Sequence, residues 1–242
     1  MSIEFHQLKV AEVRPETDDS VSITLEVPDG LTGAFDHVPG QHLVIRRDLG
    51  GEDVRRSYSI CSAPGDGLRI GVKRIPDGVF STWATTELAA GDVLEVMAPI
   101  GEFTVDCRPG IGRNAVLVAA GSGITPILAM ATTILRDEPA STVTLLYGNR
   151  TAKTIMFHED LEGLKNRHPA RFRMINVLSR EPHEVPLFEG RIDGEKLRRL
   201  AASLLDVDSV DGWYLCGPLE MVEDLSAALD NLGVPADRVN AE

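Results

Sequence analysis

The chain has 242 residues, of which 43% are hydrophobic and 25% charged, as in a globular protein large enough to bury a core without disulfides. It contains no apolar run near the roughly 18 residues that span a membrane. Its first residues also lack the basic and apolar segments of a secretory signal, so we expect a cytoplasmic protein. The net charge of −13 disfavours nucleic-acid and anionic membrane partners, although local basic residues can bind a phosphorylated cofactor.

The first part of the chain, up to about residue 105, contains short runs that are rich in β-branched residues and often alternate between apolar and polar side chains. Gly and Pro turns separate six such runs, and one helical segment interrupts them. This pattern predicts an all-β domain, a six-stranded antiparallel Greek-key barrel. The six runs are IEFHQLKVAEV, SVSITLEV, QHLVIRR, RSYSIC, LRIGVKR and DVLEVMAP.

The fourth of these runs carries side chains suited to a flat, phosphorylated cofactor. Alternation along the strand puts Arg56, Tyr58 and Ile60 on one face, with Ser57 and Ser59 on the other. A guanidinium donates two parallel hydrogen bonds to a phosphate, an aromatic ring stacks on a heterocycle, and a neighbouring hydroxyl can bond a ring nitrogen. Taken alone, the run also fits an ordinary barrel strand with an exposed arginine and a half-buried tyrosine.

A helix is predicted after the fifth run, in the segment that begins at Gly78. Gly78 permits close approach of the backbone, and Ser81 or Thr82 is expected to cap the helix. The free N–H groups and the positive dipole end at a helix start form an anion site. A capped helix after an ordinary turn is the alternative interpretation.

From about residue 114 the pattern changes to strands that alternate with helices. Continuous apolar runs such as AVLVAA and TVTLLYG fit strands buried on both faces, and segments with helical spacing of apolar residues follow them. This alternation indicates βαβ units and a Rossmann-like parallel sheet. Because residues 104–114 are polar and contain Gly and Pro, we expect two domains, the barrel at 1–106 and an α/β domain at 110–242.

The segment Gly121-Ser122-Gly123-Ile124-Thr125-Pro126 follows a buried strand and opens a helix. Its glycines allow a pyrophosphate to approach the backbone, Thr125 is expected to cap the helix, and Pro126 suits the first helical position. The segment is therefore a predicted phosphate-binding turn, although it is not G-x-G-x-x-G. A second turn, Cys216-Gly217-Pro218, also ends a strand, and a lone cysteine there fits a small buried hydrophobe equally well.

The two barrel segments, in this order and separation, resemble the FAD site of the ferredoxin–NADP reductase superfamily, with its R-x-Y-S strand and downstream G-x-x-S/T helix start. The resemblance implies that Arg56 and Ser81 or Thr82 hold the FAD pyrophosphate. It also implies that Tyr58 packs on the isoalloxazine and that Ser59 bonds near the nitrogen that accepts hydride. The residues expected to contact FAD are His42, Arg56, Tyr58, Ser59, Ile60, Val72, Lys73, Gly78, Phe80, Ser81 and Thr82.

The string AAGSGITPI closely resembles the NAD(P) turn of the same superfamily, and the C-G-P turn matches the one beside the nicotinamide. Ser179-Arg180 resembles the 2′-phosphate clamp of plant-type reductases, and Asn149-Arg150 adds a second cation, which favours NADP(H). The alternatives are that Arg180 is a solvated charge, or that Glu181 binds the ribose of NAD(H). The residues expected to contact the dinucleotide are Gly121, Gly123, Thr125, Pro126, Asn149, Arg150, Ser179, Arg180, Cys216, Gly217 and Pro218.

Nearly the whole chain resembles the reductase components of phenylacetyl-CoA epoxidases and ketosteroid hydroxylases, whose members carry a C-terminal 2Fe–2S ferredoxin domain. The ligand pattern of that domain is absent here, and three cysteines and six histidines form no metal-ligand cluster, so we expect no metal site. Glu242 matches a glutamate near the flavin in that subgroup, whereas Ala241 departs from the aromatic often found before it. The ending is interpreted as a truncated form or as a two-domain protein that uses a separate ferredoxin.

The resemblance implies an NAD(P)H-dependent flavin oxidoreductase. Electrons would pass from NADPH through FAD to a 2Fe–2S centre, on a ferredoxin domain or a separate ferredoxin, and then to an oxygenase, as in phenylacetate degradation. Tyr58, Ser59, Cys216 and Glu242 are expected to shape the transfer site. The alternatives are a stand-alone ferredoxin or flavodoxin reductase, and a non-catalytic nucleotide-binding regulatory module; the joint presence of Tyr58, Ser59 and Cys216 argues against the latter.

Overall fold

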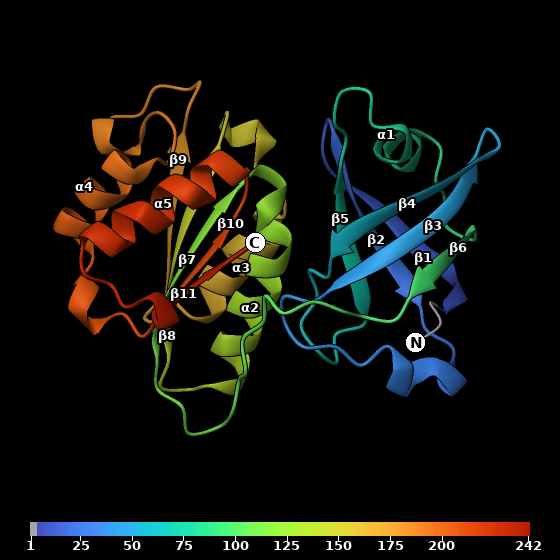
Figure 1. The fold of residues 1–242 in the computed structure, drawn as a ribbon, viewed down its shortest axis with the longest axis horizontal. Helices are drawn as coiled ribbons and strands as arrows, with labels where there is room; N and C mark the ends of the chain where they lie inside the picture. Colours follow the sequence, from blue (N-terminus) through green and yellow to red (C-terminus); the bar gives the residue numbers. More distant parts are fainter. Residues whose placement is uncertain (1–3) are drawn as a thin grey trace. The chain divides into compact units, whose positions relative to one another are not determined.

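The computed structural model describes residues 4–242, which divide into two compact units (Figure 1). The first unit extends to Asp106 and also includes Leu128–Met130. The second unit contains Cys107–Ile127 and Ala131–Glu242. Each unit has its own sheet, so each is described by itself below.

The first unit is a six-stranded antiparallel sheet in the order β4-β3-β6-β1-β2-β5. The two strands at the ends of this order are joined where β4 finishes, because Ile60 forms a bridge with Ile70 and the Cys61 N–H donates to the Arg69 carbonyl at 2.8 Å. This junction closes the sheet into the barrel that the strand pattern predicted. The strands are β1 Phe5–Thr17, β2 Ser20–Glu26, β3 His42–Leu49, β4 Glu52–Ser59, β5 Leu68–Lys73 and β6 Val93–Met97.

The interior of the barrel follows from the alternation of apolar side chains along its strands, since successive residues of a strand point to opposite faces. The short helix α1, Val79–Thr86, contributes Phe80 and Trp83 to the same core. Burial of these aliphatic and aromatic side chains is the main force that holds the unit together. Fully buried strand residues include Leu8, Val10, Ile23, Leu43, Ile45, Ile70, Val72, Leu94 and Val96.

The second unit is a five-stranded parallel sheet in the order β11-β10-β7-β8-β9. The chain runs from β7 outward to β9 and then crosses to β10 on the other side of β7. The order therefore reverses between β7 and β10, which is the place where open α/β sheets bind ligands at the carboxyl ends of their strands. The strands are β7 Asn114–Ala120, β8 Thr142–Asn149, β9 Phe172–Leu178, β10 Gly212–Cys216 and β11 Val239–Ala241.

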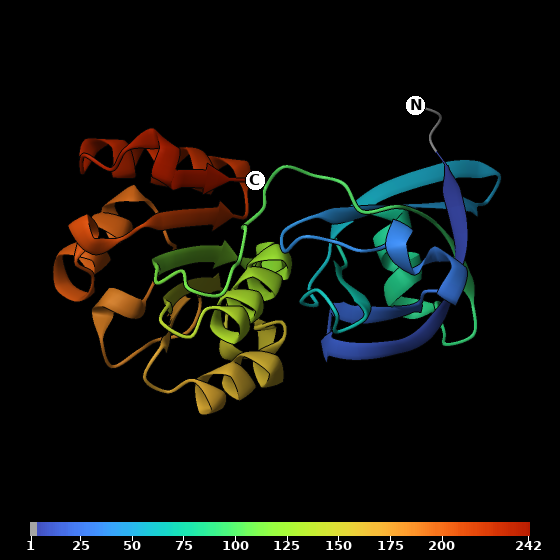
Figure 2. The ribbon, with the colours of Figure 1, turned by 90° about the horizontal axis from the view of Figure 1, so that it is seen from below.

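Helices cover both faces of this sheet, with α4 and α5 on one side and α2 and α3 on the other (Figure 2). Apolar residues of α4 and α5, among them Leu200 and Leu225, pack in one cluster with Val118 and Trp213 of the sheet. Burial on both faces explains why the strands are continuously apolar. The helices are α2 Ile124–Asp137, α3 His158–Arg167, α4 Gly194–Leu204 and α5 Leu219–Asn231.

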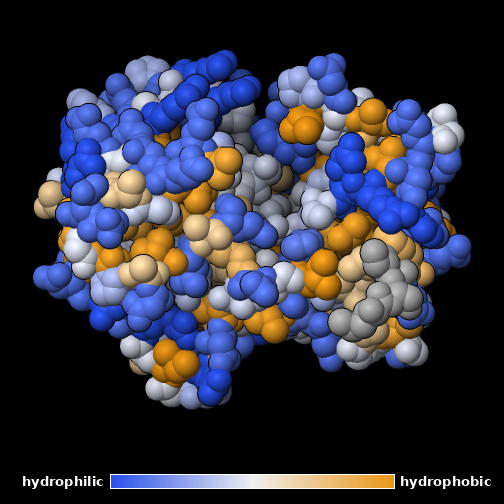
Figure 3. Space-filling model, viewed as in Figure 1, coloured by the Kyte–Doolittle hydropathy of each residue, from blue (hydrophilic) through white to orange (hydrophobic). Residues whose placement is uncertain are grey.

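Hydrophilic residues occupy much of the visible surface of both units, with smaller apolar areas between them (Figure 3). Large apolar side chains that are exposed include Ile75, Val79 and Leu219. Among residues 4–242, no helix is long and apolar enough to cross a membrane. The same residues contain no group of three or more His, Cys, Asp or Glu side chains placed to hold a metal ion.

Candidate functional site

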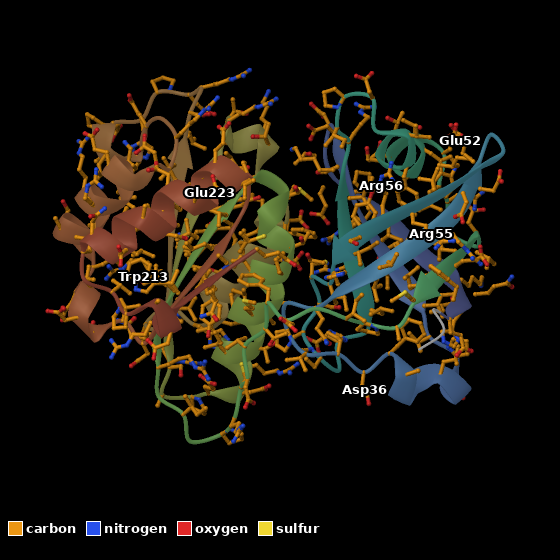
Figure 4. All side chains as sticks on the ribbon, in the orientation of Figure 1. Asp36, Glu52, Arg55, Arg56, Trp213 and Glu223 are labelled. Atoms are coloured by element: carbon orange, nitrogen blue, oxygen red, sulfur yellow. The ribbon has the colours of Figure 1, made fainter. Side chains whose placement is uncertain are left out.

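The end of β4 presents a cation and an aromatic ring side by side. Arg55 and Arg56 extend from this strand (Figure 4), but they differ in their partners. Arg55 is neutralised by Asp53, with an Nη2 to Oδ2 distance of 2.6 Å. The Arg56 guanidinium donates only to the Arg55 carbonyl, at 2.7 Å, and contacts no carboxylate among the described residues. Arg56 therefore retains both charge and donors for an anion.

Tyr58 lies half-buried on the same strand, with its ring 5.4 Å from that of Phe80 in α1. Burial raises the pKa of the Tyr58 phenol to about 12, and the nearby positive charge of Arg56 acts in the opposite direction. The phenol is therefore neutral at physiological pH, and its ring offers a fixed apolar surface on which a flat heterocycle can stack.

Ser59 and His42 sit opposite each other in the pairing of β4 with β3. Both are half-buried, and the Ser59 hydroxyl has no hydrogen-bond partner among residues 4–242. Ile60 is fully buried and its N–H donates to the Gln41 carbonyl at 2.9 Å. Backbone pairing thus fixes this end of the strand, while the Ser59 hydroxyl is left to donate to or accept from a ligand.

The start of α1 differs from the prediction that Ser81 or Thr82 caps the helix. The N-cap is Gly78, and neither Ser81 nor Thr82 caps the helix, because both already lie inside its first turn. The Ser81 hydroxyl donates back to the Gly78 carbonyl at 3.1 Å and accepts from Ile75 N–H at 3.3 Å. The first N–H groups of the helix consequently have no side-chain cap, as an anion site at a helix start requires.

Neighbouring residues of β5 and α1 are occupied by internal contacts. Val72 and Phe80 are buried in the barrel core, and the Lys73 ammonium forms an ion pair with Asp19 at 2.9 Å. A Cβ added at Gly78 would clash with the Ser81 hydroxyl and the Ile75 side chain. A side chain at position 78 would have to displace these two side chains and would approach the Ile75 carbonyl oxygen, 3.1 Å from the added Cβ, so the packing of the turn favours glycine.

The turn after β7 differs from the prediction that Thr125 caps α2 and that Pro126 is its first residue. Residues Gly121–Gly123 form a 3-10 turn with Gly121 at φ +55°, and α2 begins at Ile124 with Gly123 as its N-cap. Thr125 is therefore inside the helix rather than its cap, and its hydroxyl donates to the Ser122 carbonyl at 3.0 Å. Pro126 is the third helical residue rather than the first, where its missing N–H still costs no intrahelical bond.

The turns after β7 and β10 meet at the switch point of the parallel sheet. A Cβ added at Gly123 would lie 2.6 Å from the carbonyl carbon of Cys216 and 2.9 Å from the Gly217 nitrogen, so only glycine fits there. Tyr147 was not among the predicted site residues, yet its hydroxyl donates to the Gly121 carbonyl at 3.0 Å and holds the turn in place. Tyr147 lies two residues before Asn149 on the same face of β8, and this spacing is the sequence feature that could have identified it.

The thiol of Cys216 is a poor nucleophile in this setting. Burial raises its pKa to about 12, and the negative charge of Glu242 acts in the same direction. Glu242 is close because its N–H donates to the Leu215 carbonyl at 3.0 Å, which continues the pairing of β11 with β10. Pro218, two residues after Cys216, is the N-cap of α5. The protonated thiol thus acts as a small, neutral contact surface.

The strand ends of β8 and β9 bring the predicted Asn149-Arg150 and Ser179-Arg180 pairs together. Ser179 N–H donates to the Asn149 carbonyl at 2.9 Å, and Arg180 N–H donates to the Arg150 carbonyl at 2.8 Å. Asn149 is 8% exposed, and its Nδ2 is buried without a hydrogen-bond partner among residues 4–242. An unpaired buried donor is costly, so a ligand acceptor at this position would satisfy it.

The chain combines two features. A closed antiparallel barrel carries an arginine and a tyrosine on one strand, and a parallel sheet follows it with a glycine turn at its switch point. Together they define a class of protein. It is the class of two-domain oxidoreductases that use a flavin and a nicotinamide dinucleotide. Residues 7–105 match the model of the oxidoreductase FAD-binding domain, and residues 117–227 match that of the oxidoreductase NAD-binding domain. The chain belongs to the ferredoxin reductase family of FAD- and NAD-binding oxidoreductases.

Two named relatives refine this assignment. The chain is 42% identical over 240 residues to a component of the 1,2-phenylacetyl-CoA epoxidase of Escherichia coli K12, covering 98% of this chain and 67% of that protein. It is 34% identical over 239 residues to the ferredoxin reductase component of 3-ketosteroid-9-alpha-monooxygenase of Rhodococcus rhodochrous, covering 97% and 64%. The chain therefore spans about two thirds of the length of these relatives.

A solved structure supports the fold of the whole chain. The FAD/NAD-binding domain of nitric oxide dioxygenase from Vibrio cholerae superposes with a TM-score of 0.84 at 28% identity, covering 100% of this chain and 98% of that one. The predicted family, fold, enzyme class and pair of cofactors, FAD and a nicotinamide dinucleotide, are thereby confirmed.

Proposed function

We propose that this protein is the reductase of an oxygenase system of the phenylacetyl-CoA epoxidase type. When bound, FAD supplies the chemistry: it accepts a hydride from the nicotinamide and releases electrons one at a time. The observation that carries the proposal is the 42% identity over 98% of the chain to an epoxidase component, together with a ligand-ready cation and ring on β4. A 2Fe–2S centre on a ferredoxin domain or a separate ferredoxin would receive the electrons, since the three cysteines here lack its ligand spacing.

In the barrel, each proposed FAD contact has a distinct task. Arg56 and the first turn of α1, which has no side-chain cap, would bind the pyrophosphate. Both present N–H donors and positive charge, and neither is paired with a carboxylate of the described residues. Tyr58 would hold the isoalloxazine by stacking. The Ser59 hydroxyl, which has no partner within residues 4–242, would bond the ring edge.

In the parallel-sheet unit, the proposed contacts position the dinucleotide. The Gly121–Gly123 turn and the start of α2 would accept the pyrophosphate at the sheet's switch point. Cys216 and Gly217, with Glu242 beside them, would form the surface next to the nicotinamide. The buried Nδ2 of Asn149 would donate to the dinucleotide, and Arg150 and Arg180 would face a 2′-phosphate, which favours NADPH.

A stand-alone ferredoxin reductase is the second candidate. The Rhodococcus relative, which is the ferredoxin reductase component of a monooxygenase, supports a ferredoxin as the acceptor in either case. The two candidates share the same flavin chemistry and differ in the acceptor. Anaerobic NADPH should bleach the flavin absorbance, and the reduced protein should then transfer electrons to an added 2Fe–2S ferredoxin. A protein whose flavin is bleached by neither NADPH nor NADH would contradict both candidates.

The acceptor is identified by reconstitution. With a phenylacetyl-CoA epoxidase oxygenase and a 2Fe–2S ferredoxin present, the proposal predicts NADPH-dependent turnover of the thioester substrate. Reduction of the ferredoxin without any oxygenase turnover would instead support the stand-alone reductase.

A further inference from the structure

Two loops at the carboxyl ends of β8 and β9 are joined by three hydrogen bonds. Two of them are between backbones, from Ser179 N–H to the Asn149 carbonyl at 2.9 Å and from Arg180 N–H to the Arg150 carbonyl at 2.8 Å. The third involves a side chain: Ala152 N–H donates to Oε2 of Glu181 at 2.8 Å. Glu181 thus ties together two segments that lie 29 residues apart in the sequence.

The loops joined in this way carry an unbalanced set of charges. Arg150, Lys153 and Arg180 are exposed, and their side chains have no hydrogen-bond or ion-pair partner among residues 4–242. Paired backbones lie about 5 Å apart, so the bond between Arg180 and Arg150 brings two of these cations to neighbouring positions. Glu181 is the carboxylate closest in sequence to either arginine, and one of its oxygens is already engaged.

The bond from Ala152 N–H to Glu181 bears on which of two roles an acidic residue has at the end of β9. A carboxylate at the tip of a strand in a dinucleotide-binding sheet can accept hydrogen bonds from the adenosine ribose, which selects NAD(H). Glu181 instead has one carboxylate oxygen held by Ala152 N–H, which orients the carboxylate toward the neighbouring loop after β8. Ala152 is the first residue of the three-residue turn Ala152–Thr154, so the bond from its N–H fixes the Glu181 carboxylate to the start of that turn.

We propose that Glu181 is a positioning residue that sets the preference for a 2′-phosphorylated coenzyme. By holding the loop of residues 149–154 against that of residues 179–181, it keeps Arg150 and Arg180 directed at the same phosphate. The inference rests on the proposed function, because it assumes that the strand ends of β8 and β9 bind the adenosine end of the dinucleotide. Glu181 itself does not touch the coenzyme.

Adenosine 2′,5′-bisphosphate and 5′-AMP test the inference without hydride transfer, since they differ by the 2′-phosphate. Calorimetric titration of the flavin-loaded protein should show tighter binding of the bisphosphate by the wild type. Glu181→Ala should weaken the bisphosphate about three- to tenfold, as expected when a charge-assisted hydrogen bond that orients two cations is lost, and should leave 5′-AMP within twofold. Arg180→Ala should produce a loss of the same kind and at least the same size.

Two further variants separate the hydrogen bond from charge and from general disruption. Glu181→Gln keeps a carbonyl that can accept from Ala152 N–H, so it should bind the bisphosphate within about twofold of the wild type. Glu184→Ala, at an exposed acid of the same loop whose side chain has no partner among the described residues, should have no effect. In steady state, Glu181→Ala should raise KM for NADPH with little change in kcat, as loss of uniform binding requires.

Several results would overturn the inference. Weaker binding of 5′-AMP alone in Glu181→Ala would make Glu181 a ligand of the ribose hydroxyls. Tighter bisphosphate binding in both Glu181 variants would make Glu181 only a repelling charge. Equal weakening of both ligands would mean that it merely supports the fold, and a wild type without preference for the bisphosphate would remove the selectivity altogether. If instead neither NADPH nor NADH reduces the flavin of the wild type, it is the proposed function that fails.

Discussion

Two neighbouring arginines of β4 differ in the partners that the structure gives them. Arg55 is held by Asp53 and lies over the Phe5 ring at 5.6 Å. Within residues 4–242, the Arg56 guanidinium has only the Arg55 carbonyl as its partner. Strand alternation already favours Arg56 over Arg55 in the sequence, because Arg56 shares a face with Tyr58. Because a cation already paired with an acid has less to gain from a second anion, Arg56 is the one we assign to FAD.

The variant Arg56→Ala should lower the affinity for FAD by roughly ten- to a hundredfold, because a charge-assisted hydrogen bond contributes about 1.5–3 kcal/mol and 1.36 kcal/mol is a factor of ten. Flavin retained after dialysis, measured by absorbance, gives the result. The matched control is Arg55→Ala, which should retain FAD. Equal loss of flavin in both variants would show that the strand, and not the Arg56 guanidinium, is what matters.

The Cys216 thiol should resist alkylation at pH 8, because its pKa of about 12 keeps it protonated and only the thiolate reacts. Iodoacetamide labelling followed by peptide mass spectrometry should modify the partly exposed Cys107 first.

The raised pKa of the Cys216 thiol also makes the stability of the folded protein depend on pH. The protonated thiol favours the folded state below about pH 9, and this contribution is lost as the pH rises toward 12. Rapid labelling of Cys216 in the folded protein at pH 8 would contradict the raised pKa of its thiol.

At the scale of elements, the switch point depends on how closely the turns after β7 and β10 approach each other. Gly123 lies against the backbone of Cys216 and Gly217, and the Tyr147 hydroxyl holds Gly121 from a third strand. The start of α2 and the end of β10 are consequently one structural unit. A change in either turn is therefore expected to affect both stability and dinucleotide binding.

The variant Gly123→Ala tests this coupling. Its Cβ would meet backbone atoms that cannot rotate away, so it should destabilise the protein by at least about 1–3 kcal/mol, the usual cost of overpacking, and weaken NADPH binding as well. Thermal unfolding and coenzyme titration measure the two effects. The control is Gly33→Ala, where an added Cβ has no atom within 4 Å. A Gly123→Ala protein with wild-type melting temperature and coenzyme affinity would refute the close contact.

For the molecule as a whole, the prediction concerns which acceptors it can serve. The protein should carry FAD and not FMN, since Arg56 and the start of α1 are both proposed to bind a pyrophosphate, which FMN lacks. It should reduce ferricyanide with NADPH but reduce cytochrome c only slowly, because its three cysteines lack the ligand spacing of an iron–sulfur relay. Mass spectrometry of the released flavin and absorbance assays decide both points. FMN alone, or fast cytochrome c reduction without added ferredoxin, would contradict this description.

The chain's local patterns determined its architecture, for physical reasons that act within a few residues. Alternation of buried residues, such as Ile23 with Leu25 and Leu43 with Ile45, specifies half-buried antiparallel strands. Continuous apolar runs such as residues 115–119 specify strands buried on both faces. Glycine turns after such strands mark where a phosphate can approach the backbone. The family resemblance follows from the same segments.

Only the tertiary structure decided the contacts between segments far apart in the sequence, because those depend on packing rather than on local preference. Ser81 and Thr125 are residue types that often cap helices. The helices nevertheless begin before them, at Val79 and Ile124, so that Gly78 and Gly123 occupy the N-cap positions. The bond from Ala152 to Glu181 joins residues that only the parallel pairing of β8 with β9 brings together. The approach of Gly123 to Cys216 likewise exists because β7 and β10 are neighbours in the sheet, an order that no local sequence pattern contains.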